Sequence, residues 1–172
     1  MDFTDVVQGR ESIRSYDPAR PVPREVLERV LEAGRIAPSA ANRQPWRFLV
    51  VSSAAALERV RGCYGQGWFR DAPHVLVVAG DREKAWKRPK DGYVSIETDL
   101  TIAMDHMILA AENEGLGTCW IAAFDPDCLR AALALRPNET IFTLTPLGYP
   151  RAGFAKRRAR QRRPFAEVVE FL

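Results

Sequence analysis

The chain has 172 residues, of which 47% are hydrophobic and 27% are charged. These values predict one globular domain over residues 1–172 and exclude an intrinsically disordered or collagen-like chain. No apolar stretch approaches the roughly 20 residues that cross a bilayer, and residues 1–5 do not begin a signal peptide. The three cysteines, Cys63, Cys119 and Cys128, form no C-x-x-C pair and leave an odd one over, which argues against a secreted disulfide scaffold. We therefore expect a cytoplasmic protein whose cysteines are reduced, buried small hydrophobes.

The net charge of +3 hides an uneven distribution along the chain. Residues 151–163 carry seven basic side chains and no acidic one, so the rest of the chain is net negative. A basic block of this kind suits nucleic acid, an acidic surface, or the phosphate of a small ligand.

Periodicity and capping residues predict the first half of the fold. Pro23 opens a helix with an apolar face, and Ser53 is an N-cap residue. The expected elements are helices over 3–9, from 23 to about 34 and over 54–61, and buried strands over 47–52 and 74–78.

The longest predicted element is a helix over 94–114 that stops at Gly115, a typical helix C-cap. At 1.5 Å per residue it is roughly 30 Å long. It is apolar on almost all sides, because Ile102, Ile108 and Leu109 lie off the main stripe. We expect it to pack against a partner subunit; the alternative is a helix sandwiched between the sheet and another helix of its own chain.

The second half continues the alternation of strands and helices. We expect strands over 118–122 and 141–147, a helix that begins at Asp125-Pro126 and ends near Leu135, and a short final strand over 165–171. Strands separated by helices indicate a mixed α/β or α+β sheet. A last strand on an exposed linker is suited to pairing outside its own subunit.

Several kinds of active site are absent from the sequence. His74 and His106 with no cysteine pair make no zinc site, and there is no G-x-S-x-G elbow, P-loop or complete dinucleotide fingerprint. If the protein is an enzyme, its reactive atom must come from a bound cofactor.

Two segments carry residues that suit a cofactor. Arg10, Ser12 and Arg14 alternate, so an extended strand would point two guanidiniums and a hydroxyl to one face, as a phosphate requires. An exposed strand edge with solvated arginines explains the same pattern. Residues 38–46 form a loop whose Asn42 and Gln44 can read a planar heteroaromatic ring, although these amides could instead tie the loop to itself. For Trp46, core packing is the favoured interpretation.

The order of motifs resembles the nitroreductase family of FMN-dependent oxidoreductases. The matching motifs, spread over nearly the whole chain, are Arg-x-Ser-Ile-Arg-x-Tyr at 10–16, Pro-Ser-Ala-x-Asn-x-Gln-Pro-Trp at 38–46, Tyr-Gly-Gln at 64–66, Asp-Ala-Pro at 71–73, Gly-Leu-Gly-Thr-Cys-Trp-Ile at 115–121, Leu-Gly-Tyr-Pro at 147–150, and Arg-Arg-Pro-Phe-x-Glu-Val-Val at 162–169.

The resemblance implies an α+β fold with a mixed central sheet, assembled as an intertwined homodimer. Two FMN molecules lie at the interface of such a dimer, and the C-terminal strand crosses to the partner. By position, Arg10, Ser12, Arg14 and one or both of Arg162 and Arg163 hold the FMN phosphate and ribityl chain. The remaining implied contacts are Pro38, Ser39 and Ala40 from the opposite subunit, Asn42 and Gln66 to the ring or ribityl, and backbone along the flavin edge at Ile121, Ala122 and Ala123.

The resemblance also implies a chemistry. Hydride passes from NAD(P)H to flavin N5 and then to an electron-poor acceptor, such as a nitroaromatic or quinone, by a ping-pong mechanism. No side chain need act as an acid or base, and Arg14 is the candidate electrostatic stabiliser of reduced flavin. Longer relatives carry Glu-Gly where this chain has Ala122 and Ala123, so a side-chain role for that Glu is lost here.

Other functions remain open at this stage. The same flavin fold serves flavin fragmentation and dehalogenation, and it can bind flavin without turnover. Residues 156–163 could bind nucleic acid, although they match no known nucleic-acid-binding module. In the charged loop at 81–93, Lys84, Lys87, Arg88 and Lys90 could attract NAD(P)H phosphates beneath a Trp86 lid, or the loop could simply be solvated.

Overall fold

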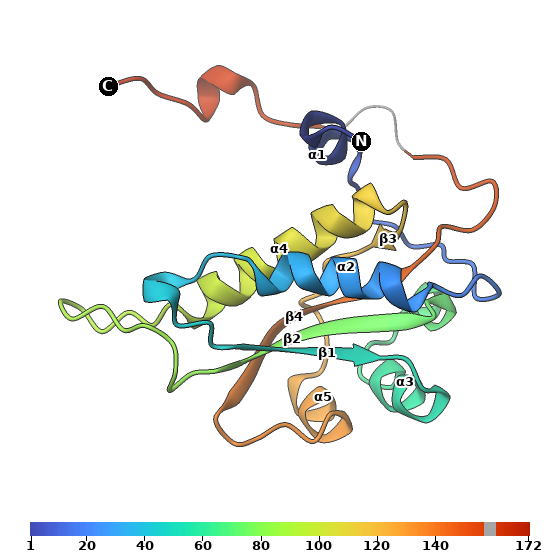
Figure 1. Ribbon diagram of the computed structural model, residues 1–172, viewed down its shortest axis with the longest axis horizontal. Helices are drawn as coiled ribbons and strands as arrows, with labels where there is room; N and C mark the ends of the chain where they lie inside the picture. Colours follow the sequence, from blue (N-terminus) through green and yellow to red (C-terminus); the bar gives the residue numbers. More distant parts are fainter. Residues whose placement is uncertain (157–160) are drawn as a thin grey trace.

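A computed structural model describes residues 1–156 and 161–172 of the chain (Figure 1). A four-stranded sheet lies at its centre, in the order β1-β2-β4-β3. The strands are β1 (Trp46–Val51), β2 (His74–Asp81), β4 (Glu139–Gly148) and the two-residue β3 (Gly117–Thr118). Every ladder of this sheet is antiparallel, which corrects the expected mixed sheet. The parallel pairing in the described residues is a single bridge from Ser12 to Thr118.

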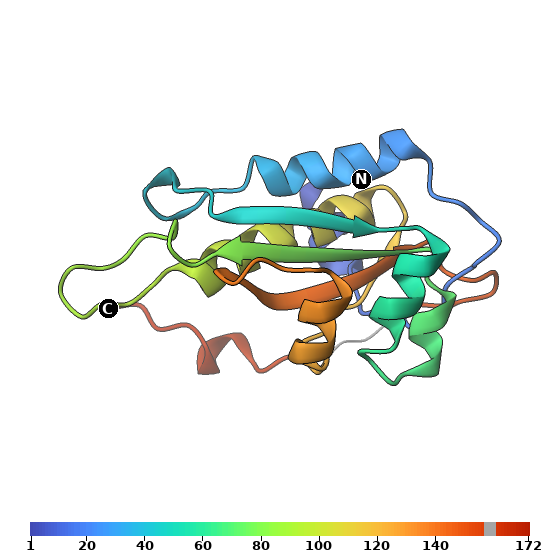
Figure 2. The ribbon, with the colours of Figure 1, turned by 90° about the horizontal axis from the view of Figure 1, so that it is seen from below.

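Helices cover both faces of the sheet (Figure 2). On one face lie α2 (Arg24–Arg35) and α4 (Ile96–Asn113), and on the other lie α3 (Ala54–Arg61) and α5 (Pro126–Ala132). Alternate residues of β2 supply the two cores, because successive side chains of a strand point to opposite faces. Leu76 and Val78 pack with α2 and α4, whereas Val75 and Val77 pack with α3 and α5.

The helix boundaries follow the capping residues. Ser53 caps α3 by accepting from the Ala56 amide, and Asp125 caps α5 by accepting from the Asp127 and Cys128 amides. Gly115, at φ +73°, closes α4, since a left-handed residue there lets the Leu116 amide donate to the Ala111 carbonyl. The remaining helix, α1 (Phe3–Gly9), precedes the Arg10 segment.

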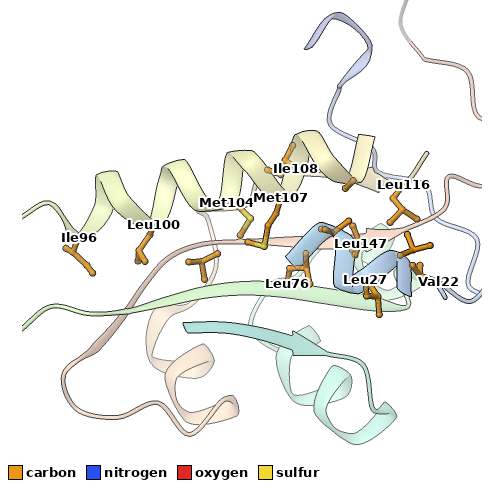
Figure 3. Packing of buried hydrophobic residues seen from close by; sticks show 14 residues of the cluster. Val22, Leu27, Leu76, Ile96, Leu100, Met104, Met107, Ile108, Leu116 and Leu147 are labelled. Atoms are coloured by element: carbon orange, nitrogen blue, oxygen red, sulfur yellow. The ribbon is translucent and has the colours of Figure 1, made fainter. Parts of the chain in front are cut away.

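Helix α4 packs against the sheet and alongside α2 of its own chain (Figure 3). Leu100, Met104 and Met107 are fully buried there. The approach of α2 is close because position 34 is glycine: a Cβ at Gly34 would lie 2.7 Å from Met107 Cγ. Ile102, which lies off the main stripe, is only half-buried. Within its own chain α4 thus contacts both the sheet and α2, although the two helices lie side by side, and packing of α4 against a partner stays a prediction.

The C-terminal residues 161–172, which we name the C-terminal arm, lie outside the two helix layers, on the side of α1 (Figure 1). The expected strand over 165–171 is wrong for the isolated chain, which forms the short 3-10 helix η3 (Phe165–Glu167) instead. A strand needs a neighbouring edge for its hydrogen bonds, and the arm lies beside none in the part of the chain that the structure describes. Phe165, Val168, Phe171 and Leu172 are all exposed.

Cys63 and Cys128 form a disulfide bond, which corrects the expectation that the cysteines are reduced. The bond joins Cys63, just after α3, to Cys128 in the first turn of α5, with a Cα–Cα distance of 5.4 Å. Cys119 is the free, buried cysteine. Within the described residues, no helix has the length and apolar composition needed to cross a membrane.

Candidate functional site

The Arg10–Arg14 segment is pinned beside β3 by backbone and buried side chains. The Ile13 amide donates to the Thr118 carbonyl at 2.7 Å, and the Tyr16 hydroxyl donates to the Ile13 carbonyl at 2.7 Å. Tyr16 is fully buried, and that burial raises its pKa well above the ordinary value, so the hydroxyl stays a donor. Because Ile13 points inward, the neighbouring Ser12 and Arg14 point outward and are exposed.

Arg14 and Gln66 lie at one edge of the molecule. The Arg14 guanidinium is 5.9 Å from the ring centre of Trp68, and Trp68 stacks on Tyr16 with ring centres 6.5 Å apart. Gln66 is exposed and immediately precedes η2 (Gly67–Asp71), the 3-10 helix that carries Trp68. The structure thus brings these two predicted contacts to the same neighbourhood.

Residues 119–121, which follow β3, form hydrogen bonds to β4. The Cys119 amide donates to Thr145 Oγ1 at 2.9 Å, and Ile121 exchanges two backbone hydrogen bonds with Leu144. This pairing is shorter than the strand expected over 118–122, since only a bridge forms at Ile121. Ile121 is buried, whereas Ala122 and Ala123 are exposed and leave their backbone accessible.

A small cavity lies next to Arg10. Its volume is about 220 Å³, and its lining includes Arg10, Asp105, Ile108, Thr118 and Trp120. Sequence reasoning did not single out Asp105. The signal that could have found it is an acidic residue three positions before Ile108, on the same face of a largely apolar helix.

The loop at 38–44 holds an unusual backbone. Ala41, Asn42 and Gln44 have φ values of 50°, 53° and 48°, a region that costs a non-glycine residue about 1–3 kcal/mol. The Gln44 amide donates to Ser39 Oγ at 2.9 Å, and Gln44 Nε2 donates to Asn42 Oδ1 at 3.0 Å. The amides therefore do tie the loop to itself, while Asn42 stays exposed. Trp46 packs, half-buried, against the core beside Phe48.

The two predicted halves of the site do not meet within one chain. The Ala40 amide donates to Asp99, near the start of α4, whereas Gly9 and Lys156 contact Glu112, near its end (Figure 1). Thirteen residues of helix separate these two contacts, which is roughly 20 Å. The loop at 38–44 and the Arg10–Arg14 segment consequently lie toward opposite ends of α4.

The basic block is only partly described, since Arg157, Arg158 and Arg160 lie outside the described residues. Lys156 Nζ donates to the Gly9 carbonyl at 3.1 Å and pairs with Glu112, which fixes the start of the linker beside Arg10. Arg162 and Arg163 are exposed, and the hydrogen bonds found for them stay within the C-terminal arm. The structure does not bring these two arginines to Arg10.

The charged loop at 81–93 is mostly exposed, and some of its charged side chains pair with one another. Arg88 forms a bidentate pair with Asp91, at 2.8 and 2.7 Å, and lowers the pKa of that carboxyl. Lys84 lies 3.6 Å from Asp81. Two of the four cations expected to attract NAD(P)H phosphates are therefore already paired, and Trp86 is half-buried.

The fold combines an antiparallel sheet, helices on both of its faces and a basic segment beside β3, and it is that of a known protein family. The family model described as "Nitroreductase family" matches residues 7–62 and 60–149. The chain is therefore a member of the nitroreductase family.

Curated relatives and solved structures agree with this assignment. An NADH dehydrogenase of Thermus thermophilus is 33% identical, over 87% of each chain. An iodotyrosine deiodinase of Danio rerio is 27% identical over 86% of this chain and 60% of its own. A nitroreductase family protein from Clostridium difficile 630 superposes with a TM-score of 0.91 at 33% identity, covering 99% and 98% of the two chains. A Desulfovibrio desulfuricans protein solved in complex with FMN gives a TM-score of 0.82 at 30% identity, covering 96% and 94%.

Proposed function

We propose that the protein is an FMN-dependent oxidoreductase that moves hydride from NADH or NADPH to an electron-poor acceptor, such as a nitroaromatic or a quinone. The observation that carries this proposal is the pair Arg10 and Arg14. Among the described residues, neither forms a salt bridge, whereas Arg29, Arg47 and Arg88 are each paired with a carboxylate. Two guanidiniums on one edge remain available for a ligand anion.

The residues at this edge fit FMN. Arg10, Ser12 and Arg14 offer two cationic donors and a hydroxyl, the chemistry that a phosphate and a ribityl chain require. Gln66, near Arg14, adds an amide that can donate and accept. The exposed Ala122 and Ala123 are too small to cover a flat ring. Support from relatives comes from an FMN complex and from the name NADH dehydrogenase.

We further propose that the site is completed by a second copy of the chain. Residues 38–42 are held at the start of α4 through Asp99, whereas Gly9, next to Arg10, lies beside Glu112 near its end. The roughly 20 Å of helix between these two contacts favours a flavin shared between two copies. The exposed apolar side chains of the C-terminal arm support exchange of this arm between two copies. In such a homodimer, Pro38, Ser39, Ala40 and Asn42 contact the partner's flavin, and the arm delivers Arg162 or Arg163 to a phosphate.

When bound, FMN supplies two-electron hydride chemistry at its N5 atom. The chain contributes fixed charge and shape. Arg14 would supply a fixed cation that favours the reduced, anionic cofactor, and Arg10 would help to hold its phosphate. The small, exposed Ala122 and Ala123 would leave room beside the cofactor for a nicotinamide and then for the acceptor, as ping-pong kinetics require.

Reductive dehalogenation is the second candidate function, because the relatives include an iodotyrosine deiodinase.

Nucleic-acid binding is disfavoured because several cations of the basic block already pair with carboxylates. Arg151 contacts Asp71 at 3.0 Å, Lys156 pairs with Glu112, and Arg163 contacts Glu167 at 3.3 Å, so part of the charge is already neutralised.

The test is flavin binding followed by anaerobic reduction. We expect the purified protein to bind FMN and to be bleached by NADH or NADPH, and we expect nitroaromatics, quinones or iodotyrosine to restore its colour according to acceptor preference. Arg14→Ala should weaken FMN affinity roughly tenfold and slow reduction, since a charge-assisted hydrogen bond is lost. Arg24→Ala, on the exposed face of α2, is the matched control.

Two results would contradict the proposal. A wild-type protein that fails to bind added FMN would remove the function itself. If Arg14→Ala left both the flavin reduction potential and the reduction rate at the wild-type values, the electrostatic role of Arg14 would be wrong.

A further inference from the structure

Asp99 is a buried carboxylate with no basic partner among the described residues. It lies in the first turn of α4, and only 1% of its surface is exposed. Its two oxygens accept from neutral donors: Oδ1 from the Ala40 amide at 2.8 Å, and Oδ2 from the Ser95 hydroxyl at 2.7 Å. A buried charge is costly unless its hydrogen-bonding capacity is used, so both donors matter.

The Ala40 bond joins α4 to the loop at 38–44. The other side-chain hydrogen bonds of this loop, from Gln44 to Ser39 and Asn42, stay inside it. They can set the shape of the loop, but they cannot set its position on the protein. The Asp99 contact lies directly before Ala41, the first of three residues with a positive φ. It therefore holds the strained part of the loop against the rigid helix.

We infer that Asp99 is a positioning residue for flavin binding, acting through the Ala40 amide on the loop that contacts the partner's flavin. This inference rests on the proposed function. With Asp99 intact, residues 38–42 are preformed and the ligand need not order them. Without it, the loop is free to leave its left-handed conformation, and FMN binding must supply the cost of ordering it again.

Three variants separate this role from general stability. Asp99→Asn keeps an Oδ1 acceptor for the Ala40 amide, and its new amide group can donate to the Ser95 hydroxyl. Asp99→Ala removes both acceptors. Leu100→Ala, at the next position of α4, removes a fully buried apolar side chain that packs near Gly80. This side chain cannot form a hydrogen bond to the loop. It is the matched control for loss of packing.

We expect Asp99→Ala to weaken FMN affinity roughly tenfold, measured by quenching of FMN fluorescence, because a hydrogen bond to a charged group is lost. Asp99→Asn should stay within about threefold of wild type, as should Leu100→Ala, although the latter also melts at a lower temperature. Equal losses of affinity in Asp99→Ala and Leu100→Ala would overturn the inference.

A rescue variant tests the route through loop strain. Ala41→Gly removes the Cβ that penalises a φ of 50°. Introduced into Asp99→Ala, it should recover part of the lost FMN affinity, whereas in Leu100→Ala it should change nothing. No recovery in the Asp99→Ala background would show that Asp99 does not offset this strain and would overturn the inference.

Amide hydrogen exchange of the flavin-free protein tests the positioning role of Asp99 separately from the proposed FMN-dependent function. Asp99→Ala should speed exchange at residues 38–44 about tenfold or more, and Asp99→Asn should not, because the Ala40 amide loses its acceptor only in the former. Unchanged exchange in Asp99→Ala refutes the positioning role even if FMN binds well. Failure of wild type to bind FMN refutes the proposed function, while the exchange comparison still decides whether Asp99 holds the loop.

Discussion

Reduction of the Cys63–Cys128 disulfide should strongly destabilise the protein. The two cysteines are 65 positions apart, so the bond closes a long loop that includes β2 and all of α4. In the chain-entropy description, a loop of this length lowers the entropy of the unfolded state enough to stabilise the fold by about 4 kcal/mol. Since domains are stable by about 5–15 kcal/mol, this is a large share of the total.

The assay is urea unfolding with and without dithiothreitol, at one fixed protein concentration and without added FMN. We expect a large loss in the free energy of unfolding on reduction. The Cys63→Ala, Cys128→Ala double variant is the control, since its unfolding should not respond to the reductant. Thiol titration of the unreduced, denatured wild type should find one group, Cys119.

Two results would refute this reasoning. Three titratable thiols in the unreduced protein would show that the bond does not form. A disulfide that forms, but whose reduction leaves the urea midpoint unchanged, would show that the closed loop does not constrain the unfolded chain.

Two further substitutions test single contacts. Glu139→Gln should cost about 2 kcal/mol at pH 7, because Glu139 is buried and accepts a bidentate bond from the partly exposed Arg47. That bond lowers the Glu139 pKa below 4.5, so its stabilisation is present above pH 4.5 and is lost as the pH falls through the folded-state pKa; urea midpoints of wild type and variant should converge in acid. Gly117→Ala would place a Cβ 2.8 Å from Ile13 Cγ2, so we expect a loss of about 1–3 kcal/mol in unfolding experiments together with weaker FMN binding; unchanged values for both would show that this contact relaxes freely.

Much of the fold could be predicted because local chemistry decides it. The Ser53 and Asp125 caps and the Gly115 C-cap mark helix ends that the structure confirms within a few residues. The inward Ile13 between outward Ser12 and Arg14 follows from strand alternation alone. The family assignment, too, follows from motifs whose order along the chain is as informative as their composition.

The predictions that failed concern contacts between residues far apart in the sequence. No local pattern pairs Cys63 with Cys128, since spacing alone does not give disulfide connectivity. Residues 165–171 have the composition of a strand, but among the described residues they pair with neither edge of the sheet, and residues 165–167 form η3 instead. Asp99 escaped notice because it is one of four acidic residues in α4, and sequence alone does not distinguish it from exposed ones; its burial and its bond to Ala40 do.

The length of α4 has a consequence for how such an assembly would be loaded. If each flavin draws one set of contacts from either end of this helix, no single copy owns a complete site, and cofactor uptake and subunit association become one linked equilibrium. Dilution then releases flavin, and added flavin holds the copies together. Two chains damaged in different halves could also share one intact site between them, so that a mixed pair would work where neither parent does.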